Sequence, residues 1–492
     1  MLGSKIKSKE NILLFILIAV TVFFRLYNLG YSDYIQDETG TFFFRGKDIT
    51  STRPGFMLTE QKGPMQIVLG FIPYSIVGDY RNELAQRLPF ALFSIASALA
   101  FYFLIKKATK NTNIAFFSAL LFSINGLIVA YGRIAQYQNV LFFFGFTSVY
   151  YFLDLLEKPK YFRNTLLGTF LLALALYTHW DAAYFLVPIV FIASKYLINK
   201  QVTLREKIFT VFSNFILFLV LTLPFFVPFF KVLTESNVRN VDYAAKIIGG
   251  GESFFQREDF FQFNFYNPYL TFYLYVVLGL AGSYLSRKSP IFIFWFVNVL
   301  FIFRFFISYS GLHFYNIFIP LIILAGYTLD FIYKQQGHLL SFVKYFVVPI
   351  TFMFLIWQSY LLFIDPDPAY PLESEKILWL ETPNYSSADN IRHKTGFPHK
   401  RYWNEINNAI NTFNKSLNEN LTYITNEDKG ISRFYIETSM GVGPKYYAIG
   451  IKYPLSFAND YQFPQIKGKH TVHKIQNEKG ETVAQIYYVD GK

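Results

Sequence analysis

The sequence contains no cysteine among its 492 residues. This absence excludes disulfide bridges, thiolate nucleophiles and cysteine-based metal sites. Charged side chains are also scarce: they make up 16% of the chain, against about a quarter in soluble proteins. Most of the chain is therefore too poor in charge to be a water-soluble domain, and any domain outside a membrane must be held together by packing alone.

Apolar side chains take the place of the missing charge. They form 53% of the chain and include 59 Phe and 37 Tyr, and apolar runs long enough to span a bilayer recur from residue 11 to residue 363. The net charge of +12 fits basic cytoplasmic loops, and no basic groove motif indicates a nucleic-acid partner. The composition predicts a polytopic all-α membrane protein embedded in the lipid bilayer.

Clusters of Lys and Arg orient the expected spans, because such clusters mark cytoplasmic loops. They lie at 5–9, 106–110, 158–163, 195–207, 287–288 and 334–344. If all are inside, an even number of spans separates each neighbouring pair. About eleven spans satisfy this condition, near 11–29, 86–105, 113–131, 138–156, 164–179, 182–198, 208–230, 269–285, 290–309, 313–332 and 343–363. We therefore predict a protein of the cytoplasmic membrane, with the N-terminus inside as a retained signal-anchor.

The same charge pattern defines what lies outside. Residues 64–79 are apolar but would break the pattern as a twelfth span, so we interpret them as an interfacial or re-entrant segment of a first outer loop at 30–85. A second long outer loop, 231–268, is either disordered or a functional lid. The membrane domain is predicted to cover 1–363, and the tail, 364–492, a small extracytoplasmic α+β domain.

The tail alternates polar and apolar residues in short runs. A helix is expected near 399–417. Strands are expected at 421–425, 433–438, 445–453, 470–475 and 482–489.

The residues that could carry chemistry gather on the predicted outer side. Asp37 and Glu38 follow the first span and suit a general base or a cation site; the alternative is that Asp37 caps a helix. Lys62 opens the interfacial segment and could hold a phosphate, or it could simply reach the headgroup region. Arg87 and Arg133 lie at the outer ends of the second and third spans.

Four further candidates lie between or within later spans. His179 and Asp181 form the corner between two spans, where His179 could bind a metal or pack as an ordinary surface residue. Arg304 lies inside an apolar helix, where an ionisable residue is either functional or extends to the interface. His313 and Tyr315 open the tenth span. Cations near the headgroup plane, a base in water and an aromatic wall are what an anionic, lipid-linked substrate requires.

Several motifs resemble the GT-C glycosyltransferases, and within them the protein O-mannosyltransferase and aminoarabinose-transferase branch (glycosyltransferase family 39 and its bacterial relatives). The resemblance covers roughly residues 10–335 and rests on short segments in a fixed order: 34–38 (Tyr-Ile-Gln-Asp-Glu), 62–64 (Lys-Gly-Pro), 87–93 (Arg-Leu-Pro-Phe-Ala-Leu-Phe), 131–135 (Tyr-Gly-Arg-Ile-Ala) and 313–326.

The resemblance implies a GT-C bundle of eleven to thirteen helices with a large first outer loop. It implies transfer of a sugar from a polyprenyl phosphate to a lipid, glycan or protein acceptor on the outer face. Asp37, with Glu38, would be the catalytic carboxylate and Lys62 would contact the donor phosphate. The other candidate phosphate ligands are Arg87, Arg133 and Arg304.

The sequence also departs from the family. It has Lys-Gly-Pro where relatives often have His-Pro-Pro or Lys-Pro-Pro, and it has Gln61 where some have an acidic metal ligand, with Glu60 one residue earlier. No cofactor is assigned on this pattern; Asp37, Glu60 and His179 are the candidate ligands of a divalent metal.

Two other classes of function remain open at this stage. A transporter or flippase of lipid-linked sugars would carry charged positions near mid-membrane and two related halves, which the sequence does not show. A polymer ligase or oligosaccharyltransferase usually carries a Trp-Trp-Asp type motif, which is also absent.

Overall fold

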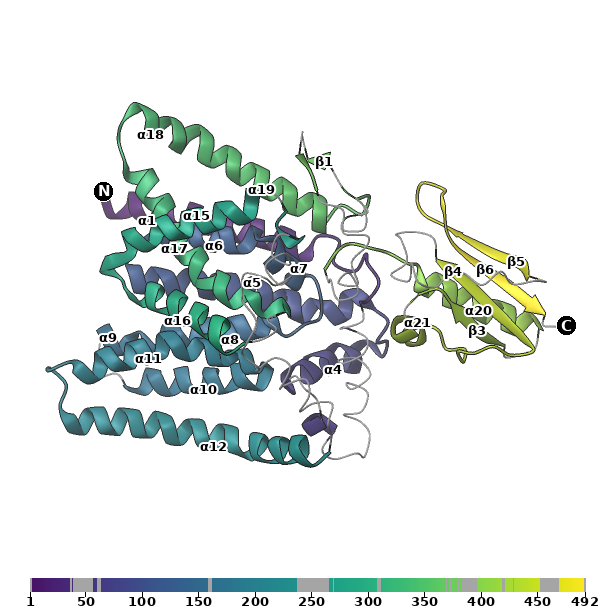
Figure 1. Cartoon of the computed structure of the whole chain (residues 1–492), viewed down its shortest axis with the longest axis horizontal. Coiled ribbons are helices and arrows are strands. Elements are labelled where there is room, and N and C mark those ends of the chain that lie inside the picture. Colours follow the sequence, from purple (N-terminus) through teal and green to yellow (C-terminus); the bar gives the residue numbers. More distant parts are fainter. Residues whose placement is uncertain are drawn as a thin grey trace. The chain divides into compact units, whose positions relative to one another are not determined.

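The computed structural model consists of a helical part and a later part with a mixed β-sheet (Figure 1). It describes residues 2–35, 38, 56–59, 63–157, 162–236, 265–268, 270–307, 311–368, 370, 374, 376–377, 380–382, 396–417, 421–427, 429–451 and 469–490.

A helix lies at each of the eleven predicted spans. In the helical part, the helices are α1 Leu2–Leu26, α4 Met65–Val77, α5 Glu83–Thr109, α6 Thr112–Ile124, α7 Gly126–Gly132, α8 Gln138–Phe152, α9 Asp154–Glu157, α10 Phe162–Thr178, α11 Ala183–Ile198, α12 Leu204–Ser236, α15 Leu270–Leu285, α16 Ile291–Phe305, α17 Tyr315–Lys334, α18 His338–Phe342 and α19 Val348–Phe363. Shorter turns are η2 Phe56–Thr59, η3 Trp180–Ala182, η5 Ser286–Lys288, η6 Gly311–Phe314 and η7 Val343–Val347.

Not every one of these helices is long enough to cross a membrane. Among the described residues, 6 helices have the length and composition of a span, or 7 if α6 and α7 form one bent span. The total of eleven spans stays a prediction. Helix α4, in the segment predicted to be interfacial or re-entrant, has 13 residues, too few for a straight span of about 20.

The break between α6 and α7 has a local cause. Asn125 ends α6 and caps α7, because its side-chain oxygen accepts the N–H groups of Leu127 at 3.1 Å and Ile128 at 3.4 Å. An Asn side chain that satisfies these groups starts a new helix. The two helices meet at a bend of 66°, so the chain turns before it reaches Arg133.

Helix α17 lies at the centre of the helical bundle and packs on α6, α15 and α16. Gly282 on α15 allows a close approach, since a Cβ there would lie 1.7 Å from the carbonyl oxygen of Leu324. At its C-terminal end, Asp330 accepts hydrogen bonds from Asn111 at 2.8 Å and pairs with Lys334 at 2.7 Å. His313 and Tyr315 lie at the opposite, N-terminal end of this helix.

The chain divides into two compact units that interleave in the sequence. One unit contains 1–27, 53–68 and 90–360; the other contains 28–52, 69–89 and 361–492. The second unit therefore joins the predicted outer loop to the tail. The domain boundary predicted at residue 363 remains a prediction.

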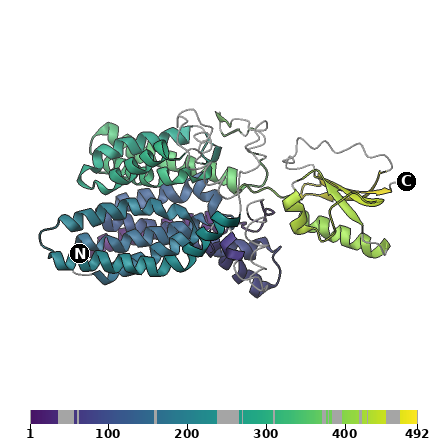
Figure 2. The ribbon, with the colours of Figure 1, turned by 60° about the horizontal axis from the view of Figure 1, so that its bottom comes forward.

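The tail contains a four-stranded mixed sheet of order β3-β4-β6-β5, with α20 beside it (Figure 2). Strands β3 Thr422–Thr425 and β4 Lys445–Ile451 are parallel, while β5 Lys469–Gln476 and β6 Thr482–Asp490 add antiparallel pairs. The remaining elements of the tail are α20 Trp403–Leu417, α21 Lys429–Tyr435 and the pair β1 Lys376–Ile377 and β2 Leu380–Glu381. The predicted small α+β fold is thus present in this part of the chain.

One predicted strand is wrong. Residues 433–438 were expected to be extended, but the chain forms α21 up to Tyr435. Ile431, Phe434 and Tyr435 are all buried. Their spacing of three and four residues places them on one helical face, and this longer period outweighed the local β propensity of Phe, Tyr and Ile.

Candidate functional site

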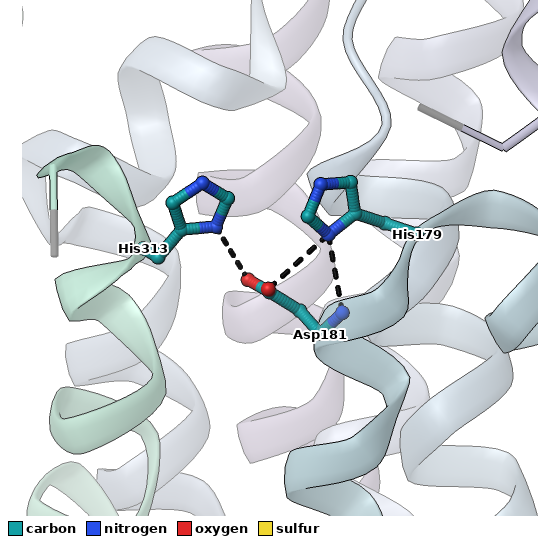
Figure 3. A group of neighbouring side chains, drawn as sticks. All are labelled: His179, Asp181 and His313. Atoms are coloured by element: carbon teal, nitrogen blue, oxygen red, sulfur yellow. Dashed lines mark hydrogen bonds and ion pairs between the residues drawn. The ribbon is translucent and has the colours of Figure 1, made fainter. Parts of the chain in front are cut away.

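Two helix corners distant in the sequence bring His179, Asp181 and His313 together (Figure 3). His179 follows α10 in an extended conformation, and Asp181 lies in η3 immediately before α11. His313 comes from η6, just before α17. The sequence named all three as separate candidates, and the structure joins them.

The carboxylate of Asp181 is the centre of this group. Its Oδ2 lies 2.7 Å from Nδ1 of His313 and accepts the side-chain amide of Asn316 at 2.9 Å, and it also accepts the hydroxyl of Tyr315. Its Oδ1 lies 3.2 Å from Nδ1 of His179. Only 6% of the Asp181 side chain is exposed, so these neighbours replace the water that would otherwise solvate its charge.

An aromatic ring fixes one side of the group. Tyr137 stacks on the ring of His179 at a centroid distance of 4.1 Å and an angle of 8°. Tyr137 begins the turn into α8, so a third corner of the bundle reaches the same place. The sequence analysis did not single out Tyr137, because a tyrosine in so aromatic a chain carries no signal of its own.

Gly63 brings the Lys-Gly-Pro motif to this corner. Its N–H donates to the carbonyl of Thr178, the residue before His179, at 3.2 Å. A Cβ at Gly63 would lie 1.9 Å from the carbonyl oxygen of Tyr177, so no larger residue fits without movement. This close approach explains why the sequence has Gly where relatives often have Pro.

Two arginines lie at the end of α1. Arg133 donates to the carbonyls of Phe24 at 3.2 Å and Tyr27 at 2.9 Å, which are the acceptors that a helix C-terminus leaves open. Arg25 is fully buried and donates through Nε to Ser94 at 2.8 Å. Its two terminal nitrogens have no hydrogen-bond partner in the described part of the chain. The sequence analysis missed Arg25; an arginine at the end of an apolar span was the available signal.

Glu38 and Arg87 form a buried ion pair in the second unit. Nε and Nη2 of Arg87 donate to the two carboxylate oxygens, each at 2.8 Å. The same guanidinium donates to the carbonyls of Leu29, Ser32 and Asp33. All three of its nitrogens are thus engaged within this segment, whereas the sequence suggested that Arg87 binds a phosphate.

The tail holds the segment that leads to Glu38. The backbone N–H of Tyr34 donates to the hydroxyl of Tyr435 at 2.8 Å, and this hydroxyl donates to Glu83 at 2.7 Å. Asp33 accepts the backbone N–H of Arg401. Burial raises the pKa of Asp33 to about 6. The start of the predicted outer loop is therefore fixed by residues near the end of the chain.

A polar cavity of about 480 Å³ lies in the same unit. Asn404, Asn407 and Asn408 of α20 line one side of it, and Arg81 and Glu83 are on another. Amide, carboxylate and guanidinium groups offer many donors and acceptors and little apolar surface.

The remaining predicted residues divide into two groups. Asp37, Glu60 and Lys62 lie outside the described residues, as does most of the predicted lid at 231–268. Arg304 is exposed on the last turn of α16, with its guanidinium 5.5 Å from the ring centre of Phe305. None of the contacts described above involves Arg304.

Comparisons with known proteins bear on this site. Residues 61–227 match the family model of dolichyl-phosphate-mannose-protein mannosyltransferases. No curated protein matches the sequence. The matched segment contains Arg87, Arg133, His179 and Asp181.

Solved structures of similar fold extend over nearly the whole chain. ArnT from Cupriavidus metallidurans in its apo state matches with a TM-score of 0.57 at 11% identity, covering 98% of this chain and 98% of that one. ArnT bound to undecaprenyl phosphate matches with 0.57 at 12% identity, over 96% and 97%. An oligosaccharyltransferase from Archaeoglobus fulgidus matches with 0.53 at 12% identity, over 88% and 64%.

At these identities the structural likeness concerns the fold, and the family match concerns the segment around the site. Together they confirm the resemblance found in the motifs. The chain is a multi-pass membrane protein of the protein O-mannosyltransferase and ArnT-like family of GT-C glycosyltransferases.

Proposed function

We propose that this protein transfers a sugar from a polyprenyl-phosphate donor to an acceptor on the outer face of the cytoplasmic membrane. The observation that carries the proposal is that an ArnT-like fold over the whole chain coincides with a family match around the candidate site. A relative of the same fold binds undecaprenyl phosphate, which supports a lipid phosphate as the donor's carrier.

The donor's charge requires cations at the site. Lys62 directly precedes Gly63, whose backbone binds Thr178 beside His179. We assign Lys62 to the donor phosphate as the principal cation, with Arg133 as a second candidate. Arg87 is better suited to holding Glu38, because its nitrogens already have acceptors. We give Arg304 no further part in the proposal, because it has no contact with the group around Asp181.

The reaction forms one bond and breaks one. The acceptor hydroxyl oxygen bonds to the anomeric carbon of the sugar, and the bond from this carbon to the phosphate oxygen breaks. The polyprenyl phosphate leaves with the electron pair, and the proton of the hydroxyl passes to Asp37. Positive groups at the phosphate stabilise the charge that develops there, so no covalent enzyme intermediate is needed.

The polar cavity of the second unit supports a hydroxylated acceptor. Three asparagines on α20 can each both donate and accept hydrogen bonds, as recognition of sugar hydroxyls requires. Replacing Asn404 by Leu should raise the KM for the acceptor more than it lowers kcat. An unchanged KM would remove the cavity from the proposal.

The decisive experiment incubates the purified protein with radiolabelled polyprenyl-phosphate sugars and extracted envelope lipids, glycans or proteins. Transfer predicts label in the acceptor and release of free polyprenyl phosphate. The alternative, a flippase, predicts movement of intact donor across a vesicle membrane without cleavage. Cleavage that depends on added acceptor supports a transferase, and movement of uncleaved donor contradicts it.

A further inference from the structure

We propose that His179, Asp181 and His313 bind a divalent transition-metal ion. Each side chain offers one ligand atom, and these atoms all lie within 4.8 Å of one another. Figure 3 shows both imidazole rings turning a nitrogen toward the carboxylate, from opposite sides. The sequence suggested His179 as a ligand only in combination with Asp37 or Glu60; Asp181 and His313 complete a different set.

The hydrogen bonds of His179 leave a conflict that a cation would resolve. Its Nδ1 accepts the backbone N–H of Asp181 at 3.1 Å, and the same atom faces Oδ1 of Asp181 at 3.2 Å. One nitrogen cannot accept the N–H through its lone pair and also carry a proton toward the carboxylate. Two electron-rich atoms therefore face each other. An ion between them would take both lone pairs and replace the backbone hydrogen bond.

The groups around Asp181 are those that orient a metal ligand. Ligating carboxylates usually accept further hydrogen bonds that fix their direction. Here Tyr315 and Asn316 both donate to Oδ2, which leaves Oδ1 facing His179. Tyr137 stacks on His179 and fixes the plane of its ring.

The ligand set points to the type of ion. Two imidazoles and one carboxylate suit Zn²⁺ and its neighbours in the first transition row, whereas Ca²⁺ and Mg²⁺ prefer oxygen ligands only. Three protein ligands leave a fourth position for water or substrate, as in catalytic zinc sites. The side chain of His313 is 19% exposed while that of His179 is 3% exposed, so the open position would lie on the side of His313.

Binding of the ion does not depend on the reaction, but its role in the reaction rests on the proposed function. Gly63 binds the residue next to His179, so the ion would lie close to where Lys62 joins the chain. An ion with an open position could then take an oxygen of the donor phosphate and share its charge with Lys62.

The test measures bound ion directly. The full chain is purified in detergent through a tag without histidine, stripped with a chelator, mixed with Zn²⁺ and separated from free ion by gel filtration. Elemental analysis should find one Zn²⁺ per chain. Excess Mg²⁺ or Ca²⁺ should not displace it, and Co²⁺ should bind with the absorption bands of nitrogen and oxygen ligation.

Variants assign the ion to the site. His179→Ala, Asp181→Asn and His313→Ala should each weaken binding at least tenfold, while His338→Ala, at the exposed start of α18, should bind as the wild type does. His313→Ala is the most informative variant, because its side chain is the least buried of the three. Gel filtration and thermal unfolding of each variant show that the chain is folded.

Two results would overturn the proposal: a wild-type chain that retains no Zn²⁺, or a folded His313→Ala chain that retains as much as His338→Ala. The transfer assay separates this failure from failure of the function. Transfer by a chain that binds no ion refutes the metal and leaves the function. One bound ion per chain without transfer supports the metal and counts against the function.

Discussion

Arg87 holds Glu38 at two points, with Nε and Nη2 each 2.8 Å from a carboxylate oxygen, and the two side chains are 1% and 0% exposed. A buried ion pair of this kind is costly to break from one side, because the remaining charge has no partner. The pair therefore fixes the Asp37-Glu38 segment from the side of Glu38.

Glu38→Gln and Arg87→Met should each destabilise the protein by about 3–5 kcal/mol, measured by thermal unfolding in detergent. The double variant should lose less than the sum of the two, because neither charge is then left alone. Arg81→Met, which breaks an exposed pair with Glu437, should cost only about 0–1 kcal/mol. Losses that add fully in the double variant would contradict the coupling.

Tyr435→Phe should loosen the segment before Glu38. It leaves the buried N–H of Tyr34 without its acceptor, at a cost of about 1–3 kcal/mol, and transfer activity should fall with it. Tyr446→Phe, on the neighbouring sheet, removes a hydroxyl from the same unit and should leave activity unchanged. Equal activities for the two variants would show that the tail does not hold this loop for the reaction.

Gly63→Ala should impair both stability and transfer. The added methyl would overlap the carbonyl of Tyr177, and such crowding costs about 1–3 kcal/mol. It would also shift Lys62, so the KM for the donor should rise. Gly441→Ala is the matched control, because a Cβ there meets nothing within 4 Å. A Gly63→Ala enzyme with unchanged KM would separate Lys62 from the donor.

Asp37→Asn should lower kcat by roughly 10²–10⁴-fold, the usual contribution of a general base, with little change in the KM for the donor. Asp490→Asn at the end of β6 should have no effect on kcat. Full activity of Asp37→Asn in a folded chain would show that another group takes the proton.

The pH dependence of stability should reveal two opposing groups in the tail. Burial raises the pKa of Asp33 to about 6 from 3.8, and burial, with Arg401, lowers the pKa of His399 to about 3 from 6.5. Asp33 binds more protons in the folded state, so its contribution is complete below pH 4 and is lost as pH rises to about 6. His399 binds fewer, so its contribution is lost as pH falls below about 6.5.

Between about pH 4 and 6 the two slopes should nearly cancel in the wild type, since each amounts to about 1.4 kcal/mol per pH unit. Asp33→Asn should then become less stable than the wild type as pH falls, and His399→Gln should become more stable. Chemical unfolding of both variants at pH 4, 5 and 6 measures the slopes. Slopes of the same sign in the two variants would refute this account.

The sequence was sufficient for the helices, because apolar runs such as 208–230 and 313–332 have no competing interpretation. Each coincides with a helix, α12 and α17 respectively. Strand assignment failed at 433–438, where Phe434 and Tyr435 favour a strand locally but pack as one face of a helix. The difference depends on tertiary packing, which a short window of sequence does not contain.

The candidate site was predictable as a set of residue types but not as an arrangement. His179, Asp181, His313 and Tyr315 were each named, yet their contacts join positions about 130 residues apart. Arg25 and Tyr137 carried no pattern of their own. The close approach of Gly63 to Thr178 was also invisible, because it depends on the path of the backbone between distant corners.

The interleaving of the second unit has a consequence for how the protein is made. Asp33 and Tyr34 leave the ribosome 368 and 401 residues before their partners Arg401 and Tyr435. The segment before Glu38 therefore waits through the synthesis of nearly the whole helical part before its contacts can form. A chain cut short before the tail would contain every helix of the bundle but would lack these contacts, so premature products should accumulate in the membrane without transferring sugar.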